Sequence, residues 1–243
     1  MRILIIGGRG YLGWQLYNYL NKKHHCQISK KKNIVDVYNL SPKKNKLKFA
    51  VIIILSGKNY SQINTKNIHE RRKIVSYLLK NKIQSNLIIY FSTKMNYSKN
   101  LIKNSYVKSH RLAEEYLKKK YAKNSFKIIR LSNVFGLNFM PLKKNIKSSS
   151  INLFINDLIK NKKIKLKTPY AKREWITISD FLKLNEKIIN GKKVNKINSK
   201  KITIKNFYRK LHEVRKSDGN FKNQFDYQIF KTFKILEKLN NKK

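Results

Sequence analysis

Short apolar runs alternate with amphipathic segments from residue 1 to about residue 135. An unbroken apolar run predicts a buried β-strand, and apolar residues that recur every three or four positions predict a helix. Strands are therefore expected at 2–6, 26–29, 34–40, 50–55, 87–91 and 127–131, and helices at 11–22, 67–82 and 105–120. This alternation predicts a doubly wound, Rossmann-like α/β fold, with a parallel sheet and helices on both faces.

The pattern changes after residue 135 and predicts a smaller C-terminal lobe. A polar loop is expected at 142–150 and a strand-like segment at 163–166. Helices are expected at 152–160, 179–189, 204–214 and 225–239. We therefore expect a Rossmann core over 1–135 and a mixed lobe over 136–243, whose late segments return to the core to form one structural unit.

The composition limits the class of protein. Hydrophobic residues make up 41% of the 243 positions, which is enough to bury a sizeable core. The single cysteine, Cys26, excludes an internal disulfide, and beside His24 and His25 it lacks a fourth ligand, so no metal site is expected. No apolar run approaches the ~18 residues of a membrane span, and the N-terminal run is too short for a signal peptide. These features predict a cytoplasmic protein without a membrane partner.

The net charge of +45 would attract polyanions. However, 48 lysines stand against 9 arginines, and they are spread along the whole chain. Nucleic-acid surfaces usually gather basic residues on one face and use arginine for base edges. We therefore interpret most basic residues, including Arg71 and Arg72 on the expected helix 67–82, as solvated surface, and do not expect a nucleic-acid partner. Ile68, Val75, Leu78 and Leu79 are expected to form the inner face of that helix.

The first strand runs into GGRGYLG, in which Gly7, Gly10 and Gly13 precede an expected helix that starts with Tyr11 and Leu12. A pyrophosphate must approach the backbone closely at such a turn, and the free N–H groups of a helix N-terminus favour anions. The position of this loop at the start of a βαβ pattern predicts a dinucleotide cofactor.

The sequence leaves NAD and NADP open. NAD sites often place an acidic residue on the ribose about 20 residues after the glycines. Here that region contains Lys30, which would suit a 2′-phosphate, and the nearest acid is Asp36.

Six motifs follow one another along the chain: GGRGYLG, VIIILSG, FSTKMNY, SYVKSHRLAEEYL, IIRLSNVFG and REWITISDF. This ordered set resembles the extended short-chain dehydrogenase/reductase family, specifically its nucleotide-sugar epimerases, dehydratases and reductases. The resemblance covers nearly the whole chain. It implies a nicotinamide cofactor, NAD or NADP, and a nucleotide-sugar substrate. On the cofactor side, it implies that Ser56 and Gly57 lie against the cofactor and that Asp36 contacts its adenine.

The same resemblance implies roles for residues at the reacting centre. Thr93 would bind the reacting sugar hydroxyl, Tyr106 would be the catalytic tyrosine, and Asn67 would support the active site. Asn133 and Arg173 would bind the nucleotide diphosphate of the substrate. Because the ordinary pKa of tyrosine is about 10, positive charge must lower it before the side chain can exchange a proton with a sugar hydroxyl.

Two features of the sequence depart from the family. His110 stands where the family has the lysine of Y-x-x-x-K, one helical turn after Tyr106, and histidine is only partly charged near neutrality. Lys108 is a poor substitute because it points to another side of the helix. Lys94 and Met95 replace the Asp-Glu pair with which dehydratases of the family eliminate water, so epimerisation or ketone reduction is expected instead.

The sequence therefore predicts an NAD(P)-dependent epimerase or reductase that acts on a nucleotide sugar for surface polysaccharide, with Thr93, Tyr106 and His110 carrying the chemistry. The alternative is a non-catalytic Rossmann protein that binds a dinucleotide or an acidic polymer as a sensor or scaffold. The helices near 67–82 and 104–120 are the expected faces of a homodimer.

Overall fold

The computed structural model describes residues 1–28, 48–57, 63, 65–81, 83–97, 104–141, 150–162, 164–194 and 197–241. The chain divides into two compact units, Met1–Leu131 and Ser132–Lys243. The strand expected at 34–40 lies outside the described residues, and so do Lys30 and Asp36.

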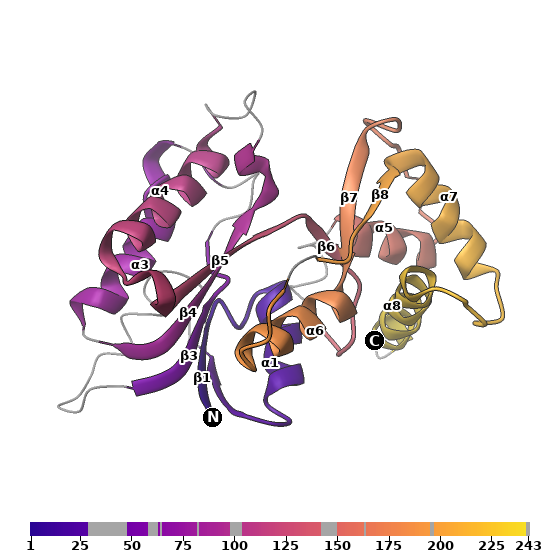
Figure 1. Ribbon diagram of the computed structural model, residues 1–243. Helices are drawn as coiled ribbons and strands as arrows, with labels where there is room; N and C mark the ends of the chain where they lie inside the picture. The colour runs from indigo at the N-terminus through magenta and orange to yellow at the C-terminus, as the bar shows by residue number, and fades with distance from the viewer. Residues whose placement is uncertain are drawn as a thin grey trace. The chain divides into compact units, whose positions relative to one another are not determined.

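The N-terminal unit is built on a parallel sheet (Figure 1). In the described part of the chain, the strand order is β2-β1-β3-β4-β5, and every neighbouring pair is parallel. The strands are β1 (Arg2–Ile6), β2 (His25–Ile28), β3 (Lys48–Ile54), β4 (Gln84–Thr93) and β5 (Phe126–Leu131). This arrangement confirms the Rossmann-like α/β fold, and each of these strands was expected within a few residues.

Helices cover both faces of this sheet. Figure 1 shows α3 (Glu70–Lys80) and α4 (Ser105–Lys120) together on one side, and α1 (Tyr11–Leu20) on the other. Alternate strand residues point to opposite faces. The face under α3 and α4 is therefore formed by Leu4, Ile6, Ile52, Ile54, Ile88 and Tyr90, which pack against Ile74, Val75, Leu78, Ala113 and Leu117.

The segment expected as one helix over 67–82 is two elements. A short 3-10 helix, η2 (Thr65–Asn67), precedes α3. Ile68, Val75 and Leu78 are buried as expected, but Leu79 is 41% exposed, so its predicted inward position was wrong. Successive helical residues differ by about 100° around the axis. Of the neighbours Leu78 and Leu79, therefore, only Leu78 lies on the stripe of α3 that faces the sheet.

The C-terminal unit holds a second sheet with order β6-β7-β8 in the residues described there. Its strands are β6 (Asn133–Phe135), β7 (Lys172–Thr177) and β8 (Lys200–Thr203). They were missed because all three are short, and β7 and β8 also carry charged residues. The strand-like segment expected at 163–166 was wrong, since its described residues 164–166 form no strand. The four expected helices are present as α5 (Ser150–Ile159), α6 (Ile178–Ile189), α7 (Ile204–Arg215) and α8 (Gln224–Asn241).

Aromatic rings form the centre of the C-terminal unit. Phe207 on α7 lies 5.2 Å from both Phe135 and Trp175, and 5.3 Å from Phe225, measured between ring centroids. All four side chains are at least nine-tenths buried. The packing of large rings from strands and helices therefore holds this unit together.

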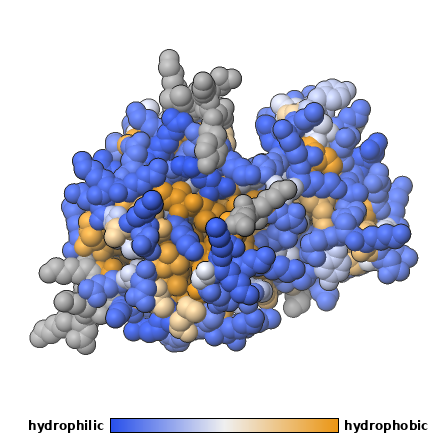
Figure 2. Space-filling model, in the orientation of Figure 1, coloured by the Kyte–Doolittle hydropathy of each residue, from blue (hydrophilic) through white to orange (hydrophobic). Residues whose placement is uncertain are grey.

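Most of the visible surface of both units is hydrophilic (Figure 2). No helix within the described residues has the length and apolar character needed to cross a membrane. The same residues contain no group of three or more histidine, cysteine or acidic side chains that could hold a metal ion.

Candidate active site

The glycine loop follows β1 and leads into α1. Gly7 has φ of +88°, and its backbone oxygen accepts a hydrogen bond from the Gly10 N–H at 2.9 Å. A Cβ on Gly13 would lie 2.2 Å from that same oxygen, so only glycine lets α1 start so close to the strand. Gly10 is the N-cap and has no side chain to bind the first N–H groups of α1, which begins at Tyr11 and Leu12. The first turn also contains no acidic residue. These features suit an anion at this helix terminus.

The segment after β3 lies against the glycine loop. A Cβ on Gly7 would lie 2.8 Å from the backbone nitrogen of Ser56, and Leu55 N–H donates to the Ile6 carbonyl at 2.9 Å. Gly57 follows with φ of +135°. The structure thus brings Gly7 and Gly13 close to Ser56 and to the Gly57 that follows it. That these residues hold a cofactor stays a prediction.

Thr93 lies at the carboxyl edge of the sheet, and Tyr106 lies on α4, the helix that follows β4 in the chain. Thr93 is the last residue of β4, and its Oγ1 accepts a hydrogen bond from Met95 N–H at 3.2 Å. Tyr106 lies in the first turn of α4, where Asn104 is the N-cap and accepts from the Tyr106 N–H at 2.9 Å. Because β1, β3 and β4 are parallel, their carboxyl ends share one edge of the sheet, where ligands bind in this fold.

His110 lies one turn after Tyr106 on the same face of α4. The two rings meet edge to face with centroids 4.8 Å apart. Nδ1 of His110 lies 2.9 Å from the hydroxyl oxygen of Tyr90 on β4. Nε2 of His110 is buried, and no described residue forms a hydrogen bond with it.

The prediction that Arg71 lies on a solvated surface was wrong. Its side chain is buried, with 4% of the residue exposed. Nη1 donates to the Ser109 hydroxyl at 2.8 Å, and Cζ lies 5.0 Å from the centroid of the Tyr106 ring. The signal was present in the sequence, because Arg71 precedes Ile74, Val75 and Leu78 by three, four and seven positions and so shares their buried stripe. Its neighbour Arg72 is exposed, as expected.

Burial controls the ionisation of these groups. Burial raises the pKa of Tyr106, and the nearby Arg71 guanidinium acts in the opposite direction. Burial, with a further contribution from Arg71, lowers the pKa of His110 well below 6.5. Burial also raises the pKa of Tyr90. Near pH 7, His110 is therefore neutral and Tyr90 is protonated.

The hydrogen-bond partners of the His110 ring indicate which of its two nitrogens carries the proton. If Tyr90 O–H donates to Nδ1, the single proton of the neutral ring resides on Nε2. The opposite tautomer would leave the Tyr90 hydroxyl proton without an acceptor in the described residues, in addition to Nε2. The first arrangement satisfies more groups, so Nε2 carries a proton that no residue in the described part of the chain accepts.

A polar network supports the same part of α4. The carboxylate of Glu114 accepts hydrogen bonds from Ser92 Oγ at 2.5 Å and Asn96 Nδ2 at 2.7 Å, and it forms an ion pair with Arg130. Burial alone would raise the pKa of Glu114, but the hydrogen bonds and the charge of Arg130 outweigh it and lower the pKa. This network joins α4 to β4 and β5.

The remaining expected site residues have separate locations. Asn67 ends η2, four positions before Arg71. Asn133 and Arg173 belong to the C-terminal unit, where both are exposed. Asn133 Nδ2 donates to the Glu174 carbonyl at 3.1 Å, which places Asn133 on β6 beside the start of β7.

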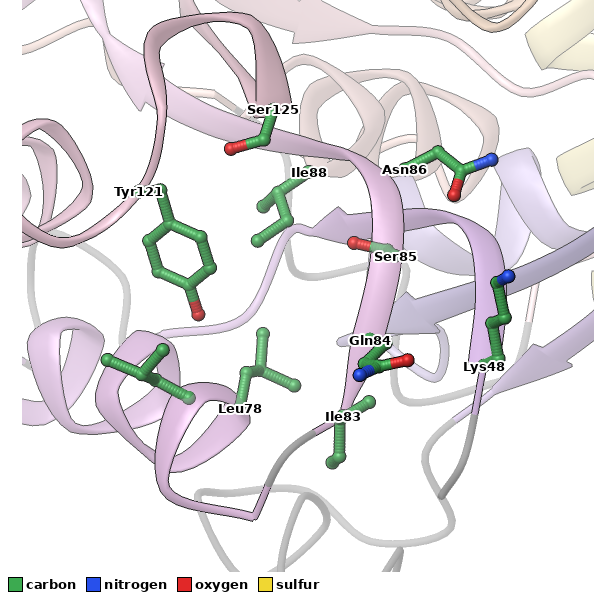
Figure 3. Close-up of a pocket in the computed structure, with 10 residues that line it drawn as sticks. Lys48, Leu78, Ile83, Gln84, Ser85, Asn86, Ile88, Tyr121 and Ser125 are labelled. Atoms are coloured by element: carbon green, nitrogen blue, oxygen red, sulfur yellow. The ribbon is translucent and has the colours of Figure 1, made fainter.

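A pocket of about 510 Å³ lies at the opposite edge of the N-terminal sheet (Figure 3). Lys48 and Gln84, the first residues of β3 and β4, are among its lining residues. Because these are the amino ends of the strands, the pocket is separate from the glycine loop and Tyr106.

A family model for the NAD dependent epimerase/dehydratase family matches residues 3–199. The chain belongs to this family. The match includes the glycine loop, Thr93, Tyr106 and His110, and it extends into the C-terminal unit. A comparison with curated protein sequences gave no match.

Solved structures of similar fold include proteins from three bacteria. UDP-glucose 4-epimerase from Thermotoga maritima, solved with UDP-glucose, has a TM-score of 0.75 at 14% identity, covering 99% of this chain and 100% of that one. The capsular polysaccharide assembling protein CapF from Staphylococcus aureus has a TM-score of 0.72 at 19% identity, covering 97% and 66%. WbmF from Bordetella bronchiseptica, solved with NAD+, has a TM-score of 0.66 at 14% identity, covering 99% and 96%. This epimerase/dehydratase-family chain thus spans slightly less than two thirds of CapF.

Proposed function

We propose that this protein is an NAD-dependent epimerase or ketone reductase that acts on a nucleotide sugar in surface polysaccharide synthesis. The observation that carries the proposal is the pair Tyr106 and His110 on α4, with Arg71 linking it to the Gly57 segment beside the glycine loop. The substrate class is supported by the structurally similar UDP-glucose 4-epimerase, and the biological setting by the similar capsular protein CapF.

The residues around the glycine loop fit a dinucleotide. Gly7, Gly10 and Gly13 keep side chains away from the N-terminus of α1, where backbone N–H groups would hold the pyrophosphate. Ser56 and Gly57 would lie along the cofactor. Nε2–H of His110 would donate to a ribose hydroxyl, as the family's lysine does. When bound, NAD+ supplies the acceptor for a hydride from a sugar carbon. NAD is favoured over NADP by the family match and by the NAD+ complex of the similar WbmF.

Tyr106 would exchange the proton. In its phenolate form, it takes the proton of the sugar hydroxyl as the adjacent C–H bond breaks and the carbonyl forms. Thr93 Oγ1 would hold the same hydroxyl. Tyr106 would return this proton when the hydride adds back to the other face of the carbonyl, which would give the epimer with no net change in the cofactor. Starting instead from a keto sugar and the reduced cofactor, the same groups complete a reduction.

The C-terminal unit would bind the nucleotide part of the substrate. Asn133 would donate to the diphosphate, and Arg173 would pair with its charge. Dimerisation through α3 and α4, which pack against each other, stays a prediction.

Cofactor binding tests the first half of the proposal. Gly10→Asp is suited to this test because, among the described residues, a Cβ at residue 10 would meet only the Gly7 oxygen, at 3.2 Å. Aspartate is also a favoured N-cap, so the fold should tolerate it. Its charge should nevertheless repel the pyrophosphate. We expect NADH, titrated by fluorescence, to bind wild type and the Gly10→Asn control, but Gly10→Asp to lose most of its affinity. Equal binding by all three proteins would contradict the proposed site.

Turnover tests the second half. Purified protein with NAD+ should epimerise, or with NADH reduce, one of a set of UDP-sugars, followed by product NMR. Tyr106→Phe should retain NADH affinity and lose turnover. Cofactor binding without turnover of any sugar nucleotide would favour the non-catalytic sensor or scaffold. Full activity in Tyr106→Phe would exclude the role given to this residue.

A further inference from the structure

The chemistry proposed for Tyr106 needs a fixed positive charge near its ring. A phenol with its ordinary pKa near 10 is almost entirely protonated at neutral pH, and burial raises the pKa of Tyr106 further. The family's lysine would supply the charge, but residue 110 is a histidine. Since burial and Arg71 lower the pKa of His110, its ring is neutral near pH 7 and cannot supply the positive charge of that lysine.

Arg71 occupies the position from which a charge would act. It reaches Tyr106 from α3, across the helix pair, and its Cζ lies 5.0 Å from the centroid of the phenol ring. The guanidinium donates to Ser109 Oγ at 2.8 Å, and Ser109 Oγ donates to the Tyr106 carbonyl at 2.7 Å. This short relay fixes the guanidinium relative to the backbone of Tyr106.

Gly57 provides the space for this guanidinium. A Cβ on Gly57 would lie 2.7 Å from both Cζ and Nε of Arg71. The side chain therefore packs directly on the backbone of the segment that follows β3 and lies beside the glycine loop. One residue thus joins that segment to the start of α4.

The surroundings of the pair identify Arg71 as the charge that matters. Among the described residues, Arg71 from α3 acts on Tyr106, on His110 and on Tyr90 from β4. Glu114, one turn after His110, acts on Tyr90, and its own charge is paired with Arg130. Lys108 on α4 is exposed.

We propose that Arg71 is the positioning residue that places a permanent positive charge beside Tyr106, in the role that the family gives to lysine at position 110. This inference rests on the proposed function of Tyr106. Arginine remains protonated at any pH of interest, so the charge does not depend on burial. The Arg71 charge acts to lower the pKa of Tyr106, and an opposite charge within about 4–6 Å of an ionisable group typically does so by about 1–3 units.

The direct test measures ionisation at position 106 without cofactor or turnover. A fluorinated tyrosine, whose phenol ionises at lower pH than that of tyrosine, is incorporated at residue 106 and its 19F signal is followed against pH. Arg71→Gln should raise the apparent pKa of this residue by about 1 unit or more. Arg71→Lys should change it less, because the charge is kept. Arg72→Gln is the matched control, since Arg72 is the next residue and is exposed, and it should leave the pKa unchanged.

A second variant protects the test against a purely structural effect. Adding His110→Lys to Arg71→Gln restores a charge one helical turn from residue 106 and should return the pKa toward the wild-type value. Structural damage from the loss of Arg71 would not be reversed in this way. An unchanged pKa in Arg71→Gln, or one that shifts equally in Arg72→Gln, would overturn the proposal.

The pH profile of kcat/KM separates this inference from the proposed function. In Arg71→Gln, the limb that requires the Tyr106 phenolate should move to higher pH, with about a tenfold loss at neutral pH for each unit of pKa. A 19F shift in a protein without turnover would contradict the enzyme proposal and leave Arg71 as the charge on Tyr106. If Arg71→Gln turns over substrate with the pH profile and the 19F pKa of the wild type, the proposed role of Arg71 is contradicted and the proposed function is not.

Discussion

Glu114→Gln is expected to destabilise the N-terminal unit through the loss of one buried charge. The carboxylate accepts hydrogen bonds from Ser92, Asn96 and Arg130, with Arg130 Nε at 3.0 Å and Nη2 on the second oxygen. Glutamine preserves the shape and one acceptor oxygen. Its amide nitrogen, however, would face the Arg130 guanidinium, so two donors would oppose each other and the arginine would lose its counter-charge.

The size of the effect follows from the exposure of the two partners. Removing one member of a fully buried ion pair costs about 3–5 kcal/mol. The Glu114 side chain is 4% exposed, but that of Arg130 is 26% exposed and can recover some hydration. We therefore expect about 3 kcal/mol, the lower end of this range. With a urea m-value of about 2 kcal/mol/M, the unfolding midpoint should fall by roughly 1.5 M.

The assay must report on the N-terminal unit alone. The chain contains two tryptophans, Trp14 in the N-terminal unit and Trp175 in the C-terminal unit. In a Trp175→Phe background, the fluorescence of Trp14 follows urea unfolding of the first unit. Glu115→Gln, an exposed neighbour on the same helix, is the matched control and should shift the midpoint little.

The pH dependence gives a second, independent check. Because the folded-state pKa of Glu114 is lowered from 4.5, its ionised form stabilises the protein fully above that value, and this contribution is lost as pH falls through the folded-state pKa. The stability difference between the parent and Glu114→Gln should therefore be constant at neutral pH and shrink under acid conditions. A midpoint shift no larger than that of Glu115→Gln at pH 7 would refute the reasoning.

Two further predictions concern other parts of the chain. Burial raises the pKa of the Cys26 thiol to about 11, so a disulfide reagent at pH 8 should modify native protein slowly and urea-unfolded protein quickly; fast modification in native buffer would contradict this. Phe207→Ala should cost about 3–5 kcal/mol in the C-terminal unit, because it empties the centre of the aromatic cluster, while exposed Tyr227→Ala should cost little. Trp175 fluorescence during urea unfolding would measure the unfolding midpoint of each variant. Similar midpoints for Phe207→Ala and Tyr227→Ala would contradict the stabilising role of the aromatic cluster.

The N-terminal fold could be predicted because its sequence signals are local. Apolar runs at β1, β3 and β4 mark strands buried on both faces, and the glycines at 7, 10 and 13 mark a turn that no side chain can enter. The C-terminal strands carried no such signal. β8 reads Lys-Lys-Ile-Thr, and it is a strand because its partner β7 satisfies its backbone groups.

The sequence by itself determined the family, the glycine loop and the spacing of Tyr106 and His110, because each depends on residues close together in the chain. Only the tertiary structure decided where the charges lie. Arg71 precedes Tyr106 by 35 positions, so its place on the buried stripe of α3 could not show that it lies beside the phenol. Packing of α3 against α4 buries it beside the phenol, where the low dielectric strengthens its effect. The local sequence around either residue contains no record of that distance.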